Sequence, residues 1–217
     1  KKGKATVVDE VSEVDREKRR KAQAEKKKKL LNPLYFVSPT RLSIRNLNKS
    51  VTDNELRNIC RNATIAGINS GLVTESDMLA HLIAQGVGAR DRTAERLSIP
   101  SAAEGRQGTR VIKKVKVMLD NMRMRNGGAQ SRGYGFAEFL HHGHALACLR
   151  ELNNNPRYSE FAATGGGKGG RRLIVEFTVE NYQKVQLLNM REEAKQQKKH
   201  QIVDEEIPAA DTDHQNN

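Results

Sequence analysis

The sequence predicts an α+β fold in which a four-stranded antiparallel sheet packs on two helices. Segments with the period-two alternation of strands and segments with helical periodicity follow one another in the order strand, helix, strand, strand, helix, strand. That order is the split β-α-β arrangement. A capping box marks the start of the first helix, and an octamer with two glycines and three aromatic residues marks the third strand.

The first predicted strand is residues 41–47. Because successive side chains of a strand point to opposite faces, Leu42 and Ile44 are expected to face the core. Ser43 and Arg45 then lie on the opposite, open face of the sheet.

The first helix is predicted to start at Thr52, whose side chain and that of Glu55 have the spacing of a capping box. Four apolar residues with helical spacing form its buried stripe, and they are Leu56, Ile59, Cys60 and Ala63.

An insertion is predicted at about residues 64–110, where a minimal module has a short loop. It contains an expected helix at 75–85 and an expected shorter one at 90–97, followed by a loop. The three arginines of the shorter helix either touch phosphate or form a solvated face, and the solvated face is the preferred interpretation; they are Arg90, Arg92 and Arg96.

The second strand is predicted at residues 111–118, with Val115 and Val117 facing inward. Its opposite face carries Lys114, Lys116 and Met118. Residues 120–131 are expected to form a mobile basic loop that carries Arg123 and Arg125.

The octamer at residues 132–139 reads RGYGFAEF, and only its sixth position, Ala137, departs from the octamer pattern of RNA-recognition modules. Tyr134 and Phe136 share one face of this strand and together form a platform on which unstacked bases can lie. Arg132 on the same face adds a cation for phosphate. The alternative is an edge strand whose aromatic residues pack under a helix.

The remaining elements are a second helix at residues 144–152, a loop that includes 157–171 and a last strand at 173–177. We divide the chain into a charged N-terminal helix and linker, the folded domain, a C-terminal helix and an acidic or polar tail, at residues 1–39, 40–178, 179–200 and 201–217. The C-terminal helix either covers part of the open face or projects to a partner.

The N-terminal helix is predicted at residues 9–31, and the apolar residues at 34–37 after it are expected to dock on the domain edge. Residues 1–29 hold 12 Lys or Arg and 6 Asp or Glu, so this segment supplies half of the net charge of +12. The runs at 16–21 and 26–29 are interpreted as a nuclear-import signal, as an arm on nucleic acid or as a solvated charged helix.

The composition indicates a polyanionic partner, because the chain has a pI of about 9.8. Cys60 and Cys148 lack paired spacing, which favours a reducing compartment. No apolar run spans a membrane, and the chain, which begins at Lys1, is expected to be part of a longer protein. We expect no enzyme, cofactor, small-molecule substrate or metal site, although His141, His142 and His144 cluster.

Four segments together resemble one known RNA-recognition module, and they are residues 32–47, 131–139, 141–156 and 171–184. The module occurs in nucleolar proteins of the nucleolar protein 4 / RNA-binding motif protein 28 family. The resemblance covers about residues 30–195. It implies the ferredoxin-like fold of RNA-recognition motifs, the nucleus and nucleolus as location, and a role in assembly of the large ribosomal subunit. Expected partners are pre-ribosomal RNA and other assembly factors or ribosomal proteins.

The leading functional hypothesis is therefore RNA binding by base stacking on Tyr134 and Phe136. Ser43 stands where such modules usually carry a third aromatic residue, so one stacking position is unfilled. Phosphate is expected to be neutralised by Arg132, Arg45, Lys114 and Lys116. The alternative is a protein-interaction scaffold whose sheet is covered by the C-terminal helix or by a partner.

Overall fold

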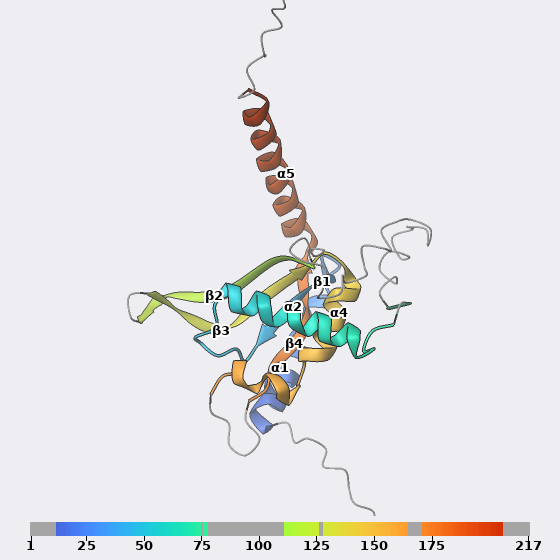
Figure 1. Cartoon of the computed structure of the whole chain (residues 1–217), viewed down its shortest axis with the longest axis vertical. Helices are drawn as coiled ribbons and strands as arrows, with labels where there is room; N and C mark the ends of the chain where they lie inside the picture. Colours follow the sequence, from blue (N-terminus) through green and yellow to red (C-terminus); the bar gives the residue numbers. More distant parts are fainter. Residues whose placement is uncertain (1–11, 75, 78–110, 126–127, 165–170, 206–217) are drawn as a thin grey trace, which may run out of the picture.

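A computed structural model of the chain describes residues 12–74, 76–77, 111–125, 128–164 and 171–205 (Figure 1). Its elements occur in the predicted order, including the predicted helix at each end. They are α1 (Glu13–Leu30), β1 (Tyr35–Arg45), α2 (Asp53–Asn69), β2 (Ile112–Arg125), β3 (Gly128–Phe139), α4 (His142–Leu152), the 3-10 helix η2 (Pro156–Phe161), β4 (Ile174–Asn181) and α5 (Tyr182–Glu205).

The four strands form one antiparallel sheet in the order β2-β3-β1-β4, so the octamer strand and the first strand are central, as predicted. Ser43 is paired with Phe136, and Arg45 with Tyr134. Together with the two helices behind the sheet, this topology confirms the predicted RNA-recognition-motif fold. It also places Tyr134 and Phe136 of the octamer beside β1 on the open face.

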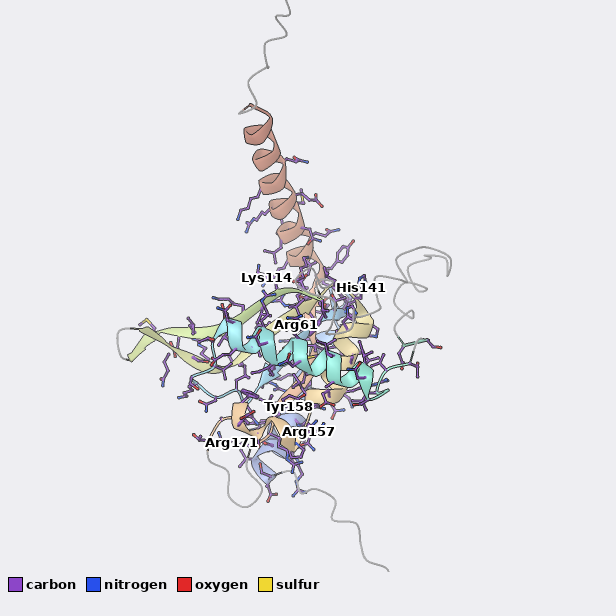
Figure 2. All side chains as sticks on the ribbon, in the orientation of Figure 1. Arg61, Lys114, His141, Arg157, Tyr158 and Arg171 are labelled. Atoms are coloured by element: carbon purple, nitrogen blue, oxygen red, sulfur yellow. The ribbon has the colours of Figure 1, made fainter. Side chains whose placement is uncertain are left out.

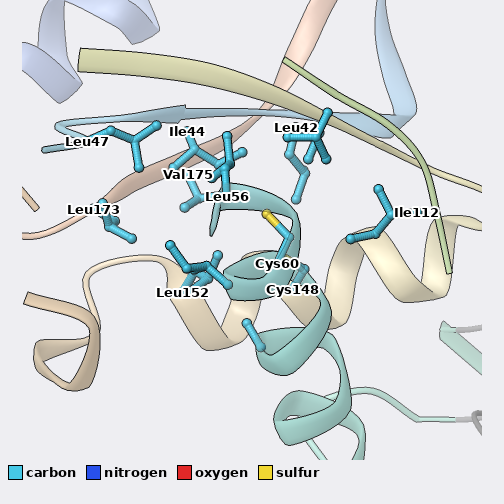
Figure 3. Packing of buried hydrophobic residues seen from close by; sticks show 14 of the residues in the cluster. Leu42, Ile44, Leu47, Leu56, Cys60, Ile112, Cys148, Leu152, Leu173 and Val175 are labelled. Atoms are coloured by element: carbon cyan, nitrogen blue, oxygen red, sulfur yellow. The ribbon is translucent and has the colours of Figure 1, made fainter. Parts of the chain in front are cut away.

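The hydrophobic core lies between the other face of the sheet and helices α2 and α4 (Figure 3). Leu42 and Ile44 of β1 point into it, as predicted, and both are fully buried. Val115 and Val117 of β2 are buried as well. The alternation read from the sequence therefore assigned the two faces of the sheet correctly.

The second glycine of the octamer permits a close approach inside this core. A Cβ atom on Gly135 would lie 2.7 Å from Cδ2 of Leu56 and 2.9 Å from the carbonyl oxygen of Lys116. A real Cβ almost never comes this near another heavy atom, so only glycine lets α2 pack so close to β3.

The predicted capping box is present at the start of α2. The Thr52 amide donates to Glu55 Oε2 at 2.8 Å, and the Glu55 amide donates to Thr52 Oγ1 at 3.3 Å. Asp53 next to it accepts a 2.6 Å hydrogen bond from the Val117 amide. Burial raises the pKa of Asp53, but this bond and the contact with Lys116 outweigh burial, so the pKa lies below its usual value.

All four strands are longer than predicted, and β4, expected at 173–177, continues to Asn181. β1 begins at Tyr35, so residues 35–37 pair with β4 instead of docking as a separate patch, and the register shifts between Val37 and Leu42. The prediction of a basic loop at 120–131 is wrong. β2 and β3 instead continue as a paired two-stranded arm, in which Arg125 lies opposite Gly128 (Figure 1). Backbone pairing therefore continues beyond the strand segments that the alternation marked.

Three other bounds also differ from the prediction. α2 runs to Asn69, so residues 64–69 belong to this helix and not to the insertion. Residues 157–161, expected in a loop, form part of η2, and Tyr158 and Phe161 pack against the core. Residues 201–205 continue α5 instead of starting the tail.

The predicted insertion helices at 75–85 and 90–97 lie outside the described residues, apart from 76–77. The glycine-rich residues 165–170 and the tail from 206 onward also lie outside them. No helix in the described ranges has the length and apolar character needed to cross a membrane.

Candidate nucleic-acid interface

The predicted aromatic pair lies on the open face of the sheet. Tyr134 and Phe136 are both partly exposed, and their ring centroids are 5.9 Å apart with perpendicular planes. Ser43 lies beside Phe136 on β1, and its hydroxyl donates to the Glu176 carbonyl oxygen at 3.4 Å. Because the two ring planes are perpendicular, the rings do not both lie flat on the sheet.

Sequence reasoning missed Arg41, which lies against the predicted stacking surface. Its guanidinium carbon is 5.0 Å from the centroid of the Phe136 ring, the geometry of a cation–π contact. The same guanidinium donates to Glu180 of β4 at 2.6 Å. The period-two pattern could have indicated this residue, since Arg41 has the same parity as Ser43 and Arg45.

Most of the predicted phosphate-binding cations already have carboxylate partners. Arg45 lies 2.7 Å from Glu176, and Lys116 lies 3.1 Å from Asp53. Arg132 lies 3.9 Å from Asp120. These pairs are partly exposed, so each contributes about 0–1 kcal/mol and can be exchanged for a phosphate at small cost.

Lys114 is exposed at the α5 end of the sheet and forms no ion pair with a described residue (Figure 2). Met118 is half-buried on β2, on the same face as the lysines. Arg123 and Arg125 lie on the β2 half of the two-stranded arm. The predicted site residues are therefore spread over the sheet and the arm.

A groove of about 470 Å³ lies between the open face and the first turns of α5. Its walls include Phe36, Arg41, Phe136, Val185 and Leu188. Beyond these turns, α5 projects away from the sheet (Figure 1). The helix therefore borders the face at one end and leaves Tyr134 partly exposed.

The three histidines lie at the start of α4 and contact aromatic or backbone groups. His142 Nδ1 lies 2.7 Å from the Pro39 carbonyl oxygen, and its ring stacks on Phe177 with centroids 5.4 Å apart. His141 and His144 meet edge to face at 5.4 Å. Among the residues that the structure places, no group of three or more His, Cys, Asp or Glu side chains could hold a metal ion.

Cys60 and Cys148 are both buried and free, and they meet where α2 packs against α4 (Figure 3). Burial raises the pKa of the Cys148 thiol well above its usual value, and the neighbouring Cys60 adds to this effect. A buried thiol with a raised pKa is a poor nucleophile, so these residues are core fillers, as predicted for Cys60.

Comparisons with known proteins identify a relative of the chain. No family model matches the chain. Human RNA-binding protein 28 is 32% identical over 182 residues, which cover 83% of this chain and 18% of that protein. The chain therefore spans less than a fifth of the length of this relative.

Solved structures show a weaker similarity. They include an Sxl-lethal protein/RNA complex, with 15% identity over 65% of this chain and 49% of that chain and a TM-score of 0.33. The RNA15 RRM has 15% identity over 65% of this chain and 92% of that chain, with a TM-score of 0.32. These scores are too low to support an argument, so the fold assignment rests on strand order and register. From that topology and the 32% identity, the chain contains an RNA-recognition-motif domain homologous to a segment of RNA-binding protein 28.

Proposed function

We propose that this chain is a non-catalytic RNA-binding module of a nucleolar assembly factor for the large ribosomal subunit. The RNA that it binds is a single-stranded or irregular segment of pre-ribosomal RNA. Bases stack on Tyr134 and Phe136, while Lys/Arg side chains contact phosphate. The nucleolar role is supported by the family resemblance of the sequence and by the identity to human RNA-binding protein 28.

The observation that carries the proposal is the pair of partly exposed rings on the central strand of an open sheet. Base–aromatic stacking contributes about 1–3 kcal/mol per base. Lys116 is paired with Phe136 across β2 and β3. Lys116, Arg132 and Met118 are proposed to contact the RNA beside the rings. Arg123 and Arg125 are proposed to contact the RNA backbone along the two-stranded arm.

The test is a fluorescence-anisotropy titration of single-stranded RNA with the Tyr134→Ala/Phe136→Ala variant. Loss of two stacking surfaces is expected to weaken binding about thirtyfold or more. Tyr182→Ala is the control, because Tyr182 is an exposed aromatic residue on α5, off the sheet. An unchanged affinity of the double variant would refute the stacking role.

A second candidate function is that of a protein-interaction scaffold in the pre-ribosome. The apolar side chains that α5 exposes favour it, and they are Tyr182, Leu187, Leu188 and Met190. Solvent-facing apolar groups in this number on one helix are typical of a contact surface. Leu187→Ser/Met190→Ser is expected to reduce co-sedimentation with pre-ribosomes while leaving affinity for isolated RNA unchanged. Unchanged co-sedimentation would remove this candidate.

A further inference from the structure

The basic N-terminal helix α1 is anchored to the domain by buried polar contacts. Asp15 is 1% exposed, and it accepts hydrogen bonds from Asn46 Nδ2 at 2.8 Å and from the Arg172 amide at 3.4 Å. Lys18 donates to Asn46 Oδ1 at 2.5 Å. Asn46 has a positive φ of 63°, which Asn tolerates better than most residues. A helix with such contacts holds a fixed position on the sheet.

α1 lies on the open side of the sheet, at the β4 edge. Ile174 pairs with Arg45 and points to the open face, yet it is fully buried and lies outside the main core cluster. Figure 3 shows α1, in blue-violet, on the opposite side of the strands from α2 and α4. Arg19 strengthens this contact by donating to Asn153 Oδ1 at 2.9 Å. α1 therefore extends the open face beyond β4.

Four cations gather where α1 meets the sheet, and they are Lys18, Arg19, Arg45 and Arg171. Partial burial lowers the pKa of Lys18, and the nearby guanidinium groups of Arg171 and Arg45 lower it further, while Asp15 opposes them. Burial is also the main cause that lowers the pKa of Arg19. The cations therefore repel one another in a partly desolvated site.

The local carboxylates compensate this charge only in part. Asp15 and Glu176 are the two acidic groups that act on Lys18 or Arg19 there. The Nε atoms of Arg19 and Arg171 are buried and have no hydrogen-bond acceptor among the described residues. Figure 2 shows Arg171 at the end of the domain where α1 lies. A bound anion would satisfy these donors and relieve the repulsion.

A groove continues from this cluster along the helix. It has a volume of about 410 Å³ between α1 and β4. Its walls are formed by Arg19, Gln23, Lys26, Lys27, Leu30 and Glu176. Arg45, paired with Tyr134 on β3, connects the groove to the stacking surface. Positively charged side chains therefore extend from the β1–β3 pair at Arg45 and Tyr134 to the C-terminal turns of α1.

We propose that the groove between α1 and β4 binds the phosphodiester backbone of the RNA strand where it passes off the sheet. The inference rests on the proposed function, since the same RNA would occupy both surfaces. An RNA strand fits better than an acidic protein segment for two reasons. Arg45, which contacts Glu176 in the groove wall, is paired with Tyr134 of the base-stacking pair. The groove also offers guanidinium donors, which match phosphate geometry. α1, with 18 residues, is about 27 Å long and can follow several nucleotides.

The test compares two lengths of single-stranded RNA, about four nucleotides to cover only the sheet and about twelve to reach α1. The groove variant is Lys26→Gln/Lys27→Gln, and circular dichroism verifies its folding. The matched control is Arg191→Gln/Lys195→Gln, which removes two exposed positive charges from α5. Tyr134→Ala/Phe136→Ala is measured beside them.

The groove variant is expected to lose about three- to tenfold in affinity for the longer RNA and none for the shorter one. The logarithm of its association constant, plotted against the logarithm of salt concentration, should have a slope that is less steep by up to about 1.4. Each lost phosphate contact accounts for about 0.7 of this change. The control should behave like the unaltered chain. Equal effects of the groove and control variants, or equal losses for both RNA lengths, overturn the proposal.

The outcomes separate this proposal from the function on which it rests. The Tyr134→Ala/Phe136→Ala variant could bind both RNAs normally while the groove variant loses affinity for the longer RNA. That result would refute base stacking on the sheet and support binding of the RNA backbone in the groove. If the groove variant keeps its RNA affinity but loses binding to a polyglutamate peptide, the groove belongs to an acidic protein partner and the RNA proposal is overturned.

Discussion

The guanidinium carbon of Arg41 lies 5.0 Å from the centroid of the Phe136 ring, and Glu180 holds the same guanidinium at 2.6 Å. One residue of β1 thus covers part of the surface on which a base is proposed to stack. For a base to use that face, Arg41 must move or stack beside it. The ion pair with Glu180 therefore influences how readily the sheet accepts RNA.

Glu180→Gln is expected to raise affinity for single-stranded RNA by about two- to fivefold, because it releases Arg41 from its ion pair for contact with phosphate. Glu193→Gln is the control, since it makes the same charge change at an exposed position on α5. Anisotropy titrations at two salt concentrations provide the measurement. Equal gains for both variants would show a general charge effect and contradict a specific role for Arg41.

Ser43→Phe is expected to raise RNA affinity, because it supplies the missing third stacking surface beside Phe136. One additional stacked base contributes about 1–3 kcal/mol, which is about five- to hundredfold in affinity. Ser43→Leu adds an apolar group without an aromatic ring and serves as the control in the same titration. A gain of the same size for Ser43→Leu would argue against stacking at this position.

Gly135→Ala is expected to destabilise the domain by about 1–3 kcal/mol, because the new methyl group would meet Leu56 and the Lys116 carbonyl oxygen within 3 Å. Thermal unfolding followed by circular dichroism measures the change as a Tm lower by several degrees. Ser43→Ala, on the open face one strand away, should change stability by less than about 0.5 kcal/mol. A Tm of Gly135→Ala equal to that of the unaltered chain would disprove the close approach of α2 to β3.

Tyr158 is expected to lose its phenolic proton only at high pH. Burial, the charge of Glu151 and the 3.1 Å hydrogen bond to its carboxylate raise the pKa of Tyr158 to about 12, above the usual value of about 10. Because the folded-state pKa is raised, the stabilisation is complete below about pH 10 and is lost as pH rises toward 12.

Phenolate absorbance of the unaltered chain and of Tyr158→Phe measures this shift. The difference between the two titrations should show one group with a midpoint near pH 12. The other three tyrosines of the chain cancel in the difference. A midpoint near pH 10 would show that the hydroxyl is not held against Glu151.

The sequence sufficed to predict the split β-α-β topology and the two faces of the sheet, because alternation of apolar and polar residues reports burial directly. Leu42, Val117 and the capping residue Thr52 lie where the pattern placed them. Strand ends were less predictable, since hydrogen bonds continue the pairing beyond the buried region. Asn126-Gly127, a dipeptide typical of two-residue hairpin turns, is the signal that could have indicated the two-stranded arm.

The site could be predicted only in part. The octamer pattern located Tyr134 and Phe136, but single-sequence patterns do not tell which carboxylate pairs with which cation. The contacts of Arg41 with Glu180 and of Asp15 with Asn46 join residues 139 and 31 positions apart. Such pairs depend on the register of the sheet and on the docking of α1, neither of which a local pattern contains.

The proposed RNA binding requires direct contact between RNA bases and the octamer strand. Ultraviolet crosslinking of the whole chain to single-stranded RNA, followed by mass spectrometry of the peptides, measures this contact. We predict nucleotide adducts on Tyr134 or Phe136. Adducts found on α1, α5 or the two-stranded arm with none on residues 132–139 would contradict base binding by this sheet.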